Sequence, residues 1–246
     1  MTIRATIFAR AALMTLVIAL SACTSIPVDQ RVESDPWESM NRSIYKTNVV
    51  FDNATTKPLS KGYKKIIPRP VRKGVANFFR NLTTPRSVIN NFLQGKPAHG
   101  LSELGRFVLN STLGIGGLID VATASGMQEY SEDFGQTAAV WGIPDGPYVM
   151  LPLLGPQTLR DAVILPVDII FDPLYQYDNS SVRDKLYFIR LIDLRYRLLV
   201  ADKFLDDSQD RYVTTRESYL QNREYEVYDG DPPVDDDFFD EFLEEE

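Results

Sequence analysis

The chain is poor in the side chains that most enzymes use for catalysis. It has one cysteine, Cys23, and one histidine, His99, among 246 residues. A single cysteine excludes a disulfide within the chain. No serine lies in a Gly-x-Ser-x-Gly elbow, and no Gly-x-x-x-x-Gly-Lys phosphate loop occurs. We therefore expect no enzyme, cofactor or metal site, and no nucleic-acid partner.

Long apolar runs and strand patterns are also missing from most of the chain. After residue 22 there is no uninterrupted run of about 20 apolar residues, the length that spans a bilayer. The longest candidate, 138–154, is broken by Pro144, Asp145 and Pro152. No alternating strand pattern of any length and no internal repeat is visible. The sequence predicts an all-α protein without a full transmembrane helix.

The first residues resemble a lipoprotein leader. Arg4 and Arg10 precede an apolar run, 11–20, which has the length of a signal-peptide core. The following Leu-Ser-Ala-Cys, ending at Cys23, resembles the bacterial lipobox, whose cysteine is acylated and becomes the mature N-terminus. We expect a signal peptide over 1–22, lipid on Cys23 and a lipid-anchored linker over 23–34. An ordinary signal peptide with an incidental cysteine is the alternative.

Charge is distributed unevenly. The formal net charge is -8, yet twelve Asp or Glu and no Lys or Arg follow Arg223. We expect residues 229–246 to form an acidic, disordered tail, which either keeps the protein soluble or attracts a basic partner. Between Lys57 and Arg106, eleven Lys or Arg face a single acid. The densest cationic cluster could face anionic lipid headgroups or could be an ordinary solvated helix face. Its members are Lys61, Lys64, Lys65, Arg69, Arg72 and Lys73.

Apolar residues at helical spacing predict the elements. Asp35 suits a helix cap before Pro36, and Pro70 and Pro85 are each expected to begin a further helix. The stretch 57–70 is expected to be a connector or a broken helix. Further helices are expected near 101–109 and over 134–142, 157–170 and 182–225. The third of these is expected to be kinked or broken at Pro166, and the last to be interrupted near 206–208. In the helix that begins at Pro85, the side chains expected to be buried are Val88, Ile89, Phe92 and Leu93.

Two apolar segments, 114–119 and 148–154, lack the polar face of a soluble surface. The first has three glycines among aliphatic residues, and in the second Pro152 argues against a central strand. Either segment could be a packed turn, or could contact lipid. The residues that we assign to a lipid path or membrane contact are Gly114, Ile115, Gly116, Gly117, Leu118, Val149, Leu151, Leu153 and Leu154.

Several ordered motifs together resemble the MlaA/VacJ family of outer-membrane lipoproteins. The first is Asp-Pro-Trp-Glu with Asn-Arg, over 35–42. Asn-Ser-Thr, Gly-Ile-Gly-Gly and Asp-Val-Ala follow between 110 and 122. Asp-Phe-Gly-Gln-Thr begins at Asp133, and Leu-Pro-Leu-Leu-Gly-Pro ends at Pro156. The resemblance covers about 35–160.

This resemblance implies a single ring-like helical domain over 35–228, partly embedded in one membrane leaflet. It implies that mislocalised phospholipid leaves the outer leaflet of the outer membrane through a central channel, without enzymatic chemistry. A soluble periplasmic lipid carrier would receive the lipid, and trimeric porins would surround the ring. The expected location is the periplasmic leaflet of the outer membrane, since Thr24 rather than Asp follows the cysteine.

Two other functions remain open on the sequence. The chain could be a structural lipoprotein that associates with porins and carries no lipid. It could also be a periplasmic lipid hydrolase, although no acid–base pair for that reaction is visible. A lipid conduit is the function that we expect.

Overall fold

A computed structural model describes residues 34–233. Within them are ten helices and one two-stranded hairpin, so the predicted helical class is confirmed. Across residues 34–233 no helix is both long and apolar enough to cross a membrane. Cys23 and the tail beyond residue 233 lie outside the described residues.

The first half of the chain forms helices only. They are α2 (Glu38–Ala54), α3 (Thr56–Ile66), α4 (Arg69–Leu93), α5 (Pro97–Thr112) and α6 (Val121–Ala124).

The second half adds the hairpin and the remaining helices. They are α7 (Phe134–Val140), β1 (Tyr148–Leu151), β2 (Gly155–Thr158), α8 (Leu159–Ile170), α9 (Ser180–Leu198), α10 (Ala201–Asp206) and α11 (Arg211–Val227).

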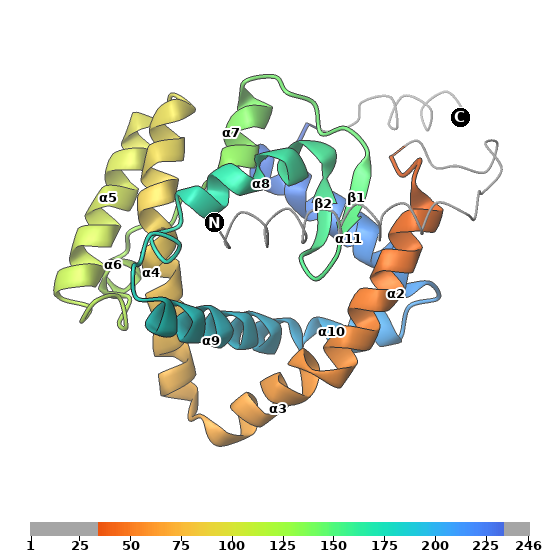
Figure 1. Ribbon diagram of the computed structural model, residues 1–246. Coiled ribbons are helices and arrows are strands. Elements are labelled where there is room, and N and C mark those ends of the chain that lie inside the picture. Colours follow the sequence, from red (N-terminus) through yellow and green to blue (C-terminus); the bar gives the residue numbers. More distant parts are fainter. Residues whose placement is uncertain (1–33, 234–246) are drawn as a thin grey trace, which may run out of the picture.

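The elements are arranged as a ring (Figure 1). Helix α2 packs on α3, α3 on α9, α9 on α4, α4 on α7, and α7 on α8. The hairpin then contacts both α8 and α2, which closes the circuit. Helix α5 lies alongside α4 at one edge of the ring, and α11 passes behind the hairpin.

Some helix boundaries differ from the sequence expectation. The stretch 57–70 contains the regular helix α3, because Pro58 falls in its first turn, where a missing N–H is tolerated. The two helices expected at Pro70 and Pro85 are one continuous helix, α4. Helix α8 likewise runs through Pro166. Packing of α4 along α5 holds the helix together through Pro85.

The hairpin is a second departure from the expectation. Strands β1 and β2 pair in antiparallel register from Tyr148–Thr158 to Leu151–Gly155. Pro152 lies in the turn between them, where it interrupts no ladder hydrogen bond.

Asparagines of α2 satisfy the outer edge of strand β1. The Asn41 amide donates to the Tyr148 carbonyl at 3.0 Å and accepts from the Met150 N–H at 2.9 Å. One heptad later, Asn48 donates to the Leu151 carbonyl at 2.9 Å and accepts from the Leu153 N–H at 2.8 Å. Helix α2 therefore takes the place of a third strand.

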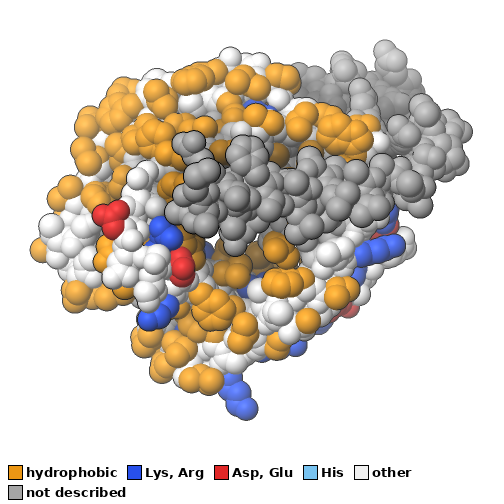
Figure 2. Space-filling view, viewed as in Figure 1, with side chains coloured by type: hydrophobic (Ala, Val, Ile, Leu, Met, Phe, Trp, Pro, Cys, Tyr) orange, Lys and Arg blue, Asp and Glu red, His pale blue; other side chains and the backbone are white. Residues whose placement is uncertain are grey.

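Burial is inverted relative to a water-soluble protein. Among the described residues, nine hydrophobic side chains are buried, against twenty polar or charged ones. Helix α4 buries Thr84, Ser87 and Asn91 on its inner face. Ile89, Phe92 and Leu93, which the periodicity placed in a core, are instead exposed on the opposite face, and Val88 is half-buried. Figure 2 shows hydrophobic side chains spread over the α4–α5 side and the α7–α8 rim.

Candidate functional site

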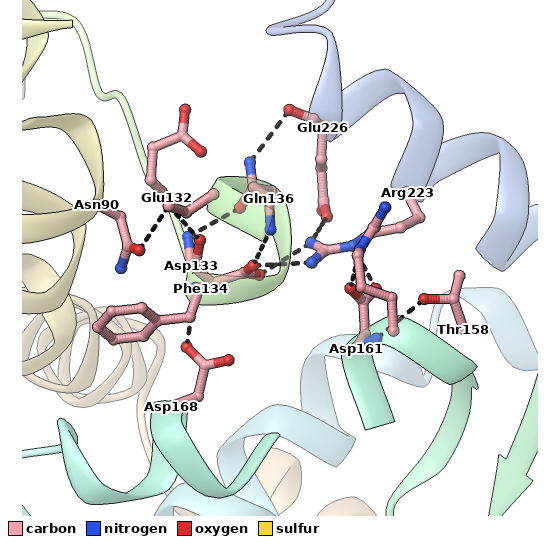
Figure 3. A network of polar contacts seen from close by, with 12 residues as sticks. Asn90, Glu132, Asp133, Phe134, Gln136, Thr158, Asp161, Asp168, Arg223 and Glu226 are labelled. Carbon is pink, nitrogen blue, oxygen red and sulfur yellow. Dashed lines mark hydrogen bonds and ion pairs between the residues drawn. The ribbon is translucent and has the colours of Figure 1, made fainter. Parts of the chain in front are cut away.

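One buried polar network joins α7, α8 and α11 (Figure 3). Arg223 donates to both carboxylate oxygens of Asp133, at 2.8 and 2.9 Å, and to Asp161 at 2.7 Å. Asp133 also caps α7 by accepting from the Gln136 N–H at 2.8 Å, and the Gln136 side-chain oxygen accepts from the Asp133 N–H at 3.0 Å. This Asp133–Gln136 capping box lies in the motif that begins at Asp133.

The charged form of Asp133 is stabilised by its partners in this network. Burial alone would raise the pKa of Asp133, but hydrogen bonds from Arg223 and the positive charge of that guanidinium lower it below its ordinary value. The contact is so close that Gly135 has no room for a side chain: a Cβ there would lie 2.4 Å from both Arg223 and Asp161. The contacts of Arg223 with Asp133 and Asp161 therefore brace the junction of α7, α8 and α11.

A second buried cluster joins the start of the described chain to α11. Asp35, expected to cap the first helix, is instead fully buried, and Trp37 occupies the cap position without a side-chain bond. The Asp35 carboxylate accepts from Asn41 at 2.8 Å and Arg216 at 3.0 Å, and from the Tyr212 hydroxyl. Burial and the neighbouring carboxylate raise the pKa of Tyr212.

Helix α5 shows the inverted packing most clearly. Glu103, Arg106 and Asn110, spaced three to four residues apart, are buried on its inner face. Glu103 accepts from the Tyr130 N–H at 2.7 Å, and Arg106 donates to the Met127 carbonyl at 2.6 Å. The opposite face is apolar and exposed. Its residues are Leu101, Leu104 and Val108.

The predicted glycine segment forms a tight loop after α5. Gly114 and Gly117 are buried, and Cβ atoms there would lie 2.2 Å from the Ile119 carbonyl oxygen and 2.6 Å from the Asn81 Cβ. Ile115 and Leu118 are exposed, and Ile115 has a φ of 54°, which a β-branched residue rarely adopts. Gly116 is exposed and has a φ of 65°.

The predicted segment around the hairpin has a similar tip. Val149 and Leu151 are half-buried in strand β1, whereas Leu153 and Leu154 are exposed in the turn. Leu153 has a φ of 63°, and the bond from its N–H to Asn48 fixes this conformation. The two segments lie apart in Figure 1, at the α4–α5 side and near α2, so the structure does not bring them together. Both present aliphatic side chains at strained turns.

The basic cluster lies at the corner between α3 and α4, and five of its six members are exposed. Arg72 has a different role, because its guanidinium donates to the carbonyls of Lys64 and Ile67 and lies 4.7 Å from the centroid of the Tyr196 ring. It therefore closes the C-terminus of α3. The exposed members are Lys61, Lys64, Lys65, Arg69 and Lys73.

Sequence reasoning missed an apolar cavity of about 430 Å³ between α2, the hairpin, α9, α10 and α11. Its walls include Val49, Met150 and Phe204, which are far apart in the sequence. A chain of ion pairs borders it, in which Arg195 binds Asp52 at 2.7 Å and Asp202 at 2.9 Å. No sequence motif connects these residues, so only the fold reveals the cavity.

Side chains for catalysis remain scarce in the folded chain. His99 stacks on Tyr130, with ring centroids 3.8 Å apart. Within residues 34–233 no group of three or more His, Cys, Asp or Glu side chains is arranged to hold a metal ion. The buried carboxylates described above are engaged with arginine or backbone donors.

Known proteins share both the sequence and this arrangement. The profile of the family described as MlaA lipoprotein matches residues 33–226. The "Intermembrane phospholipid transport system lipoprotein MlaA" of Shigella flexneri is 36% identical over 216 residues, covering 86% of each chain. The protein of the same name from Haemophilus influenzae is 32% identical over 219 residues, covering 87% of this chain and 88% of its own.

A solved structure agrees as well. A chain from "Structural basis for maintenance of bacterial outer membrane lipid asymmetry" superimposes with a TM-score of 0.70 at 36% identity, covering 79% of this chain and 99% of the other. Together with the profile match over most of the sequence, this likeness confirms the family that the ordered motifs predicted. The chain belongs to the MlaA lipoprotein family.

Proposed function

We propose that this protein is a non-enzymatic conduit for phospholipid at the outer membrane. The observation that carries the proposal is the inverted burial, with polar side chains inside and aliphatic side chains outside. Exposed apolar area of this extent is unfavourable in water and marks surfaces that contact a membrane or another protein. The names of the relatives, which refer to intermembrane phospholipid transport, supply the cargo.

A phospholipid requires two kinds of surface. Its two chains, each of about 16 carbons, would cost on the order of 25 kcal/mol if exposed to water, at roughly 0.8 kcal/mol per methylene. Its phosphate cannot enter hydrocarbon cheaply. The exterior of the ring is aliphatic and its interior is polar and charged. The first surface is compatible with the acyl chains of a phospholipid, and the second with its phosphate.

The exposed turns support partial immersion in one leaflet. Ile115 and Leu153 hold left-handed backbone conformations that are costly for these residues, and neither side chain is buried in return. Aliphatic tips of this kind gain stability when hydrocarbon covers them. We propose that both tips insert into the periplasmic leaflet of the outer membrane, where lipid on Cys23 would anchor the chain.

The sequence contains no Gly-x-x-x-x-Gly-Lys phosphate loop, so the chain has no ATP-hydrolysis site of that class to drive transport. Direction would then come from a partner or from a concentration difference. We propose a soluble periplasmic lipid carrier as the receiver and trimeric porins as neighbours in the membrane. The residues assigned to a lipid path, Gly114 to Leu118 together with Val149, Leu151, Leu153 and Leu154, would form parts of the membrane contact. The exposed members of the basic cluster, Lys61, Lys64, Lys65, Arg69 and Lys73, would face lipid headgroups.

Mass spectrometry of lipid that co-purifies with the mature protein tests the proposal. We expect near-stoichiometric phospholipid on the native protein and loss of that lipid in a Leu118→Asp, Leu153→Asp double variant. The control is Ser181→Asp with Gln209→Asp, which adds the same charge at exposed polar positions. If the native protein carried no lipid above the detergent background, this result would contradict the conduit and favour a porin-associated scaffold.

A further inference from the structure

A short amphipathic helix separates two cavities of opposite character. Helix α10 has the apolar cavity of about 430 Å³ on one side and a charged groove of about 500 Å³ on the other. Asp202 borders both. We propose that one phospholipid binds astride α10, with an acyl chain in the apolar cavity and a headgroup carrying both phosphate and ammonium in the charged groove. This proposal rests on the proposed function and adds the lipid class and its place.

The apolar cavity has the size and walls of a site for an acyl chain. Its volume lies within the range of about 300–1,000 Å³ that small-molecule sites occupy. Met150 forms a buried part of the wall. Two other wall residues, Leu198 and Phe204, remain 52% and 63% exposed, so an occupant would remove apolar surface from water.

The groove carries both signs of charge. Lys61 and Lys64 line it from α3, and Lys203 and Asp207 line it from α10 and the residue that follows. None of these four side chains forms an ion pair with another described residue, whereas Lys57 beside them is paired with Asp202 at 3.0 Å. A groove with cations alone would suit any anion. Free cations together with a free carboxylate complement a zwitterionic headgroup.

The position of α10 places the two sites within reach of a single lipid. Ala201, Phe204 and Leu205 face the apolar cavity, and Lys203 faces the groove. A helix is only about 10 Å across including side chains. Asp202 fastens α10 between the cavities through Arg195 and Lys57, so the short helix stays in place as the divider.

Filling the cavity tests the acyl-chain half. The full-length lipidated protein is incubated with vesicles of equal phosphatidylethanolamine and phosphatidylglycerol, and native mass spectrometry measures the bound lipid. We expect Ala201→Trp to lose most of its bound phospholipid, because the indole occupies the cavity. Leu101→Trp, on the exposed face of α5, is the matched control and should keep it.

A second variant covers the case in which Ala201→Trp does not fold, which circular dichroism reports. Phe204→Ala removes an exposed apolar wall and should also lower lipid retention. Wild-type retention in Phe204→Ala, or in folded Ala201→Trp, overturns the site while leaving the conduit intact. Absence of phospholipid on the wild-type protein contradicts the conduit itself.

The same vesicles test the headgroup half. We expect the wild-type protein to retain phosphatidylethanolamine in preference to phosphatidylglycerol. Asp207→Asn should reduce that preference about fivefold, the factor that one charge near a lipid surface contributes. Lys61→Gln with Lys64→Gln should weaken retention of both lipids. An unchanged lipid ratio in Asp207→Asn, or a wild-type preference for phosphatidylglycerol, overturns the zwitterionic assignment.

Discussion

Buried arginine side chains connect the elements in the interior of this protein, a role that aliphatic side chains have in most folds. Arg223 is 6% exposed and binds Asp133 and Asp161 at the same time. Nearer the N-terminus of α11, Arg216 binds the buried carboxylate of Asp35 at 3.0 Å. Such pairs contribute little net stability over an apolar core, but they are costly to break from one side, because the remaining charge stays buried.

Loss of the Arg223 guanidinium should therefore be severe. Arg223→Gln leaves Asp133 without its cation and Asp161 with Arg160 alone, and we expect it to lower the free energy of unfolding by about 3–5 kcal/mol. Urea unfolding in detergent measures the change. Arg183→Gln breaks an exposed pair with Asp184 and should cost less than about 1 kcal/mol. Equal effects of the two variants would contradict a structural role for the network.

Glu132 should make stability depend on pH. Burial raises the pKa of Glu132 from 4.5 to about 7, although hydrogen bonds from Gln94 and Lys96 act to lower it. Between these values the folded protein holds a proton that the unfolded chain has released. Stability from this group is therefore present at low pH and falls as the pH rises toward 7.

The expected readout is the Tm at about pH 5 and about pH 8. The Tm of the wild-type protein should fall more between these values than that of Glu132→Gln, which has no proton to lose. Comparison of the two proteins cancels the contributions of other carboxylates. A Glu132→Gln protein with the same pH dependence as the wild type would rule out this titration.

At the scale of elements, two asparagines one heptad apart allow helix α2 to pair with the free edge of strand β1. Asn41 and Asn48 satisfy four backbone groups of residues 148–153. An isolated two-stranded hairpin is marginal in water, so these bonds and the packing on α8 keep it in place.

The two asparagines should differ in energetic weight. Asn41 is fully buried, and Asn41→Ala leaves the Tyr148 carbonyl and the Met150 N–H without partners, a loss of about 1–3 kcal/mol for each buried group. Asn48→Ala exposes an already accessible turn to water and should cost less than about 1 kcal/mol. Urea unfolding of the two variants in the same detergent checks this order, and a cost for Asn48→Ala as large as that for Asn41→Ala would contradict it.

Helical spacing predicted most elements because period and caps are local properties. Asp133 and Gln136 form a capping box within one turn, and α7 begins where they indicate. Pro85 was misleading, since packing on α5 stabilises α4 across this proline. At Pro166 the continuous helix α8 excludes the break, which was one of the two predicted alternatives. The orientation of the apolar faces was also wrong for Ile89, because periodicity shows that a helix has an apolar side but not which medium that side contacts.

The candidate site was less predictable than the helices. Residues 114–118 and 149–154 stood out because they are contiguous and apolar, and their proposed lipid contact stays a prediction. The cavity beside α10 draws on α2, the hairpin, α9, α10 and α11. Its walls come together only through tertiary packing, so no local pattern could indicate them.

At the scale of the whole molecule, the ring combines a polar frame with an apolar exterior. The circuit from α2 through α3, α9, α4, α7, α8 and back through the hairpin closes without a large aliphatic core. Such packing is stable when the exterior lies in hydrocarbon, since exposed aliphatic surface then carries no hydration cost. The proposed conduit depends on this immersion.

Accessibility of spin labels on the exterior tests the immersion most directly. Cys23 is the only native cysteine and is expected to carry lipid, so labelled Leu104→Cys and Val108→Cys variants can be compared with Lys46→Cys and Gln209→Cys in reconstituted membranes. We predict that labels on the exposed α5 face at Leu104 and Val108 collide with oxygen dissolved in hydrocarbon, and that labels at Lys46 and Gln209 collide with a water-soluble nickel chelate. Labels at Leu104 and Val108 as accessible to the chelate as those at Lys46 and Gln209 would contradict the account.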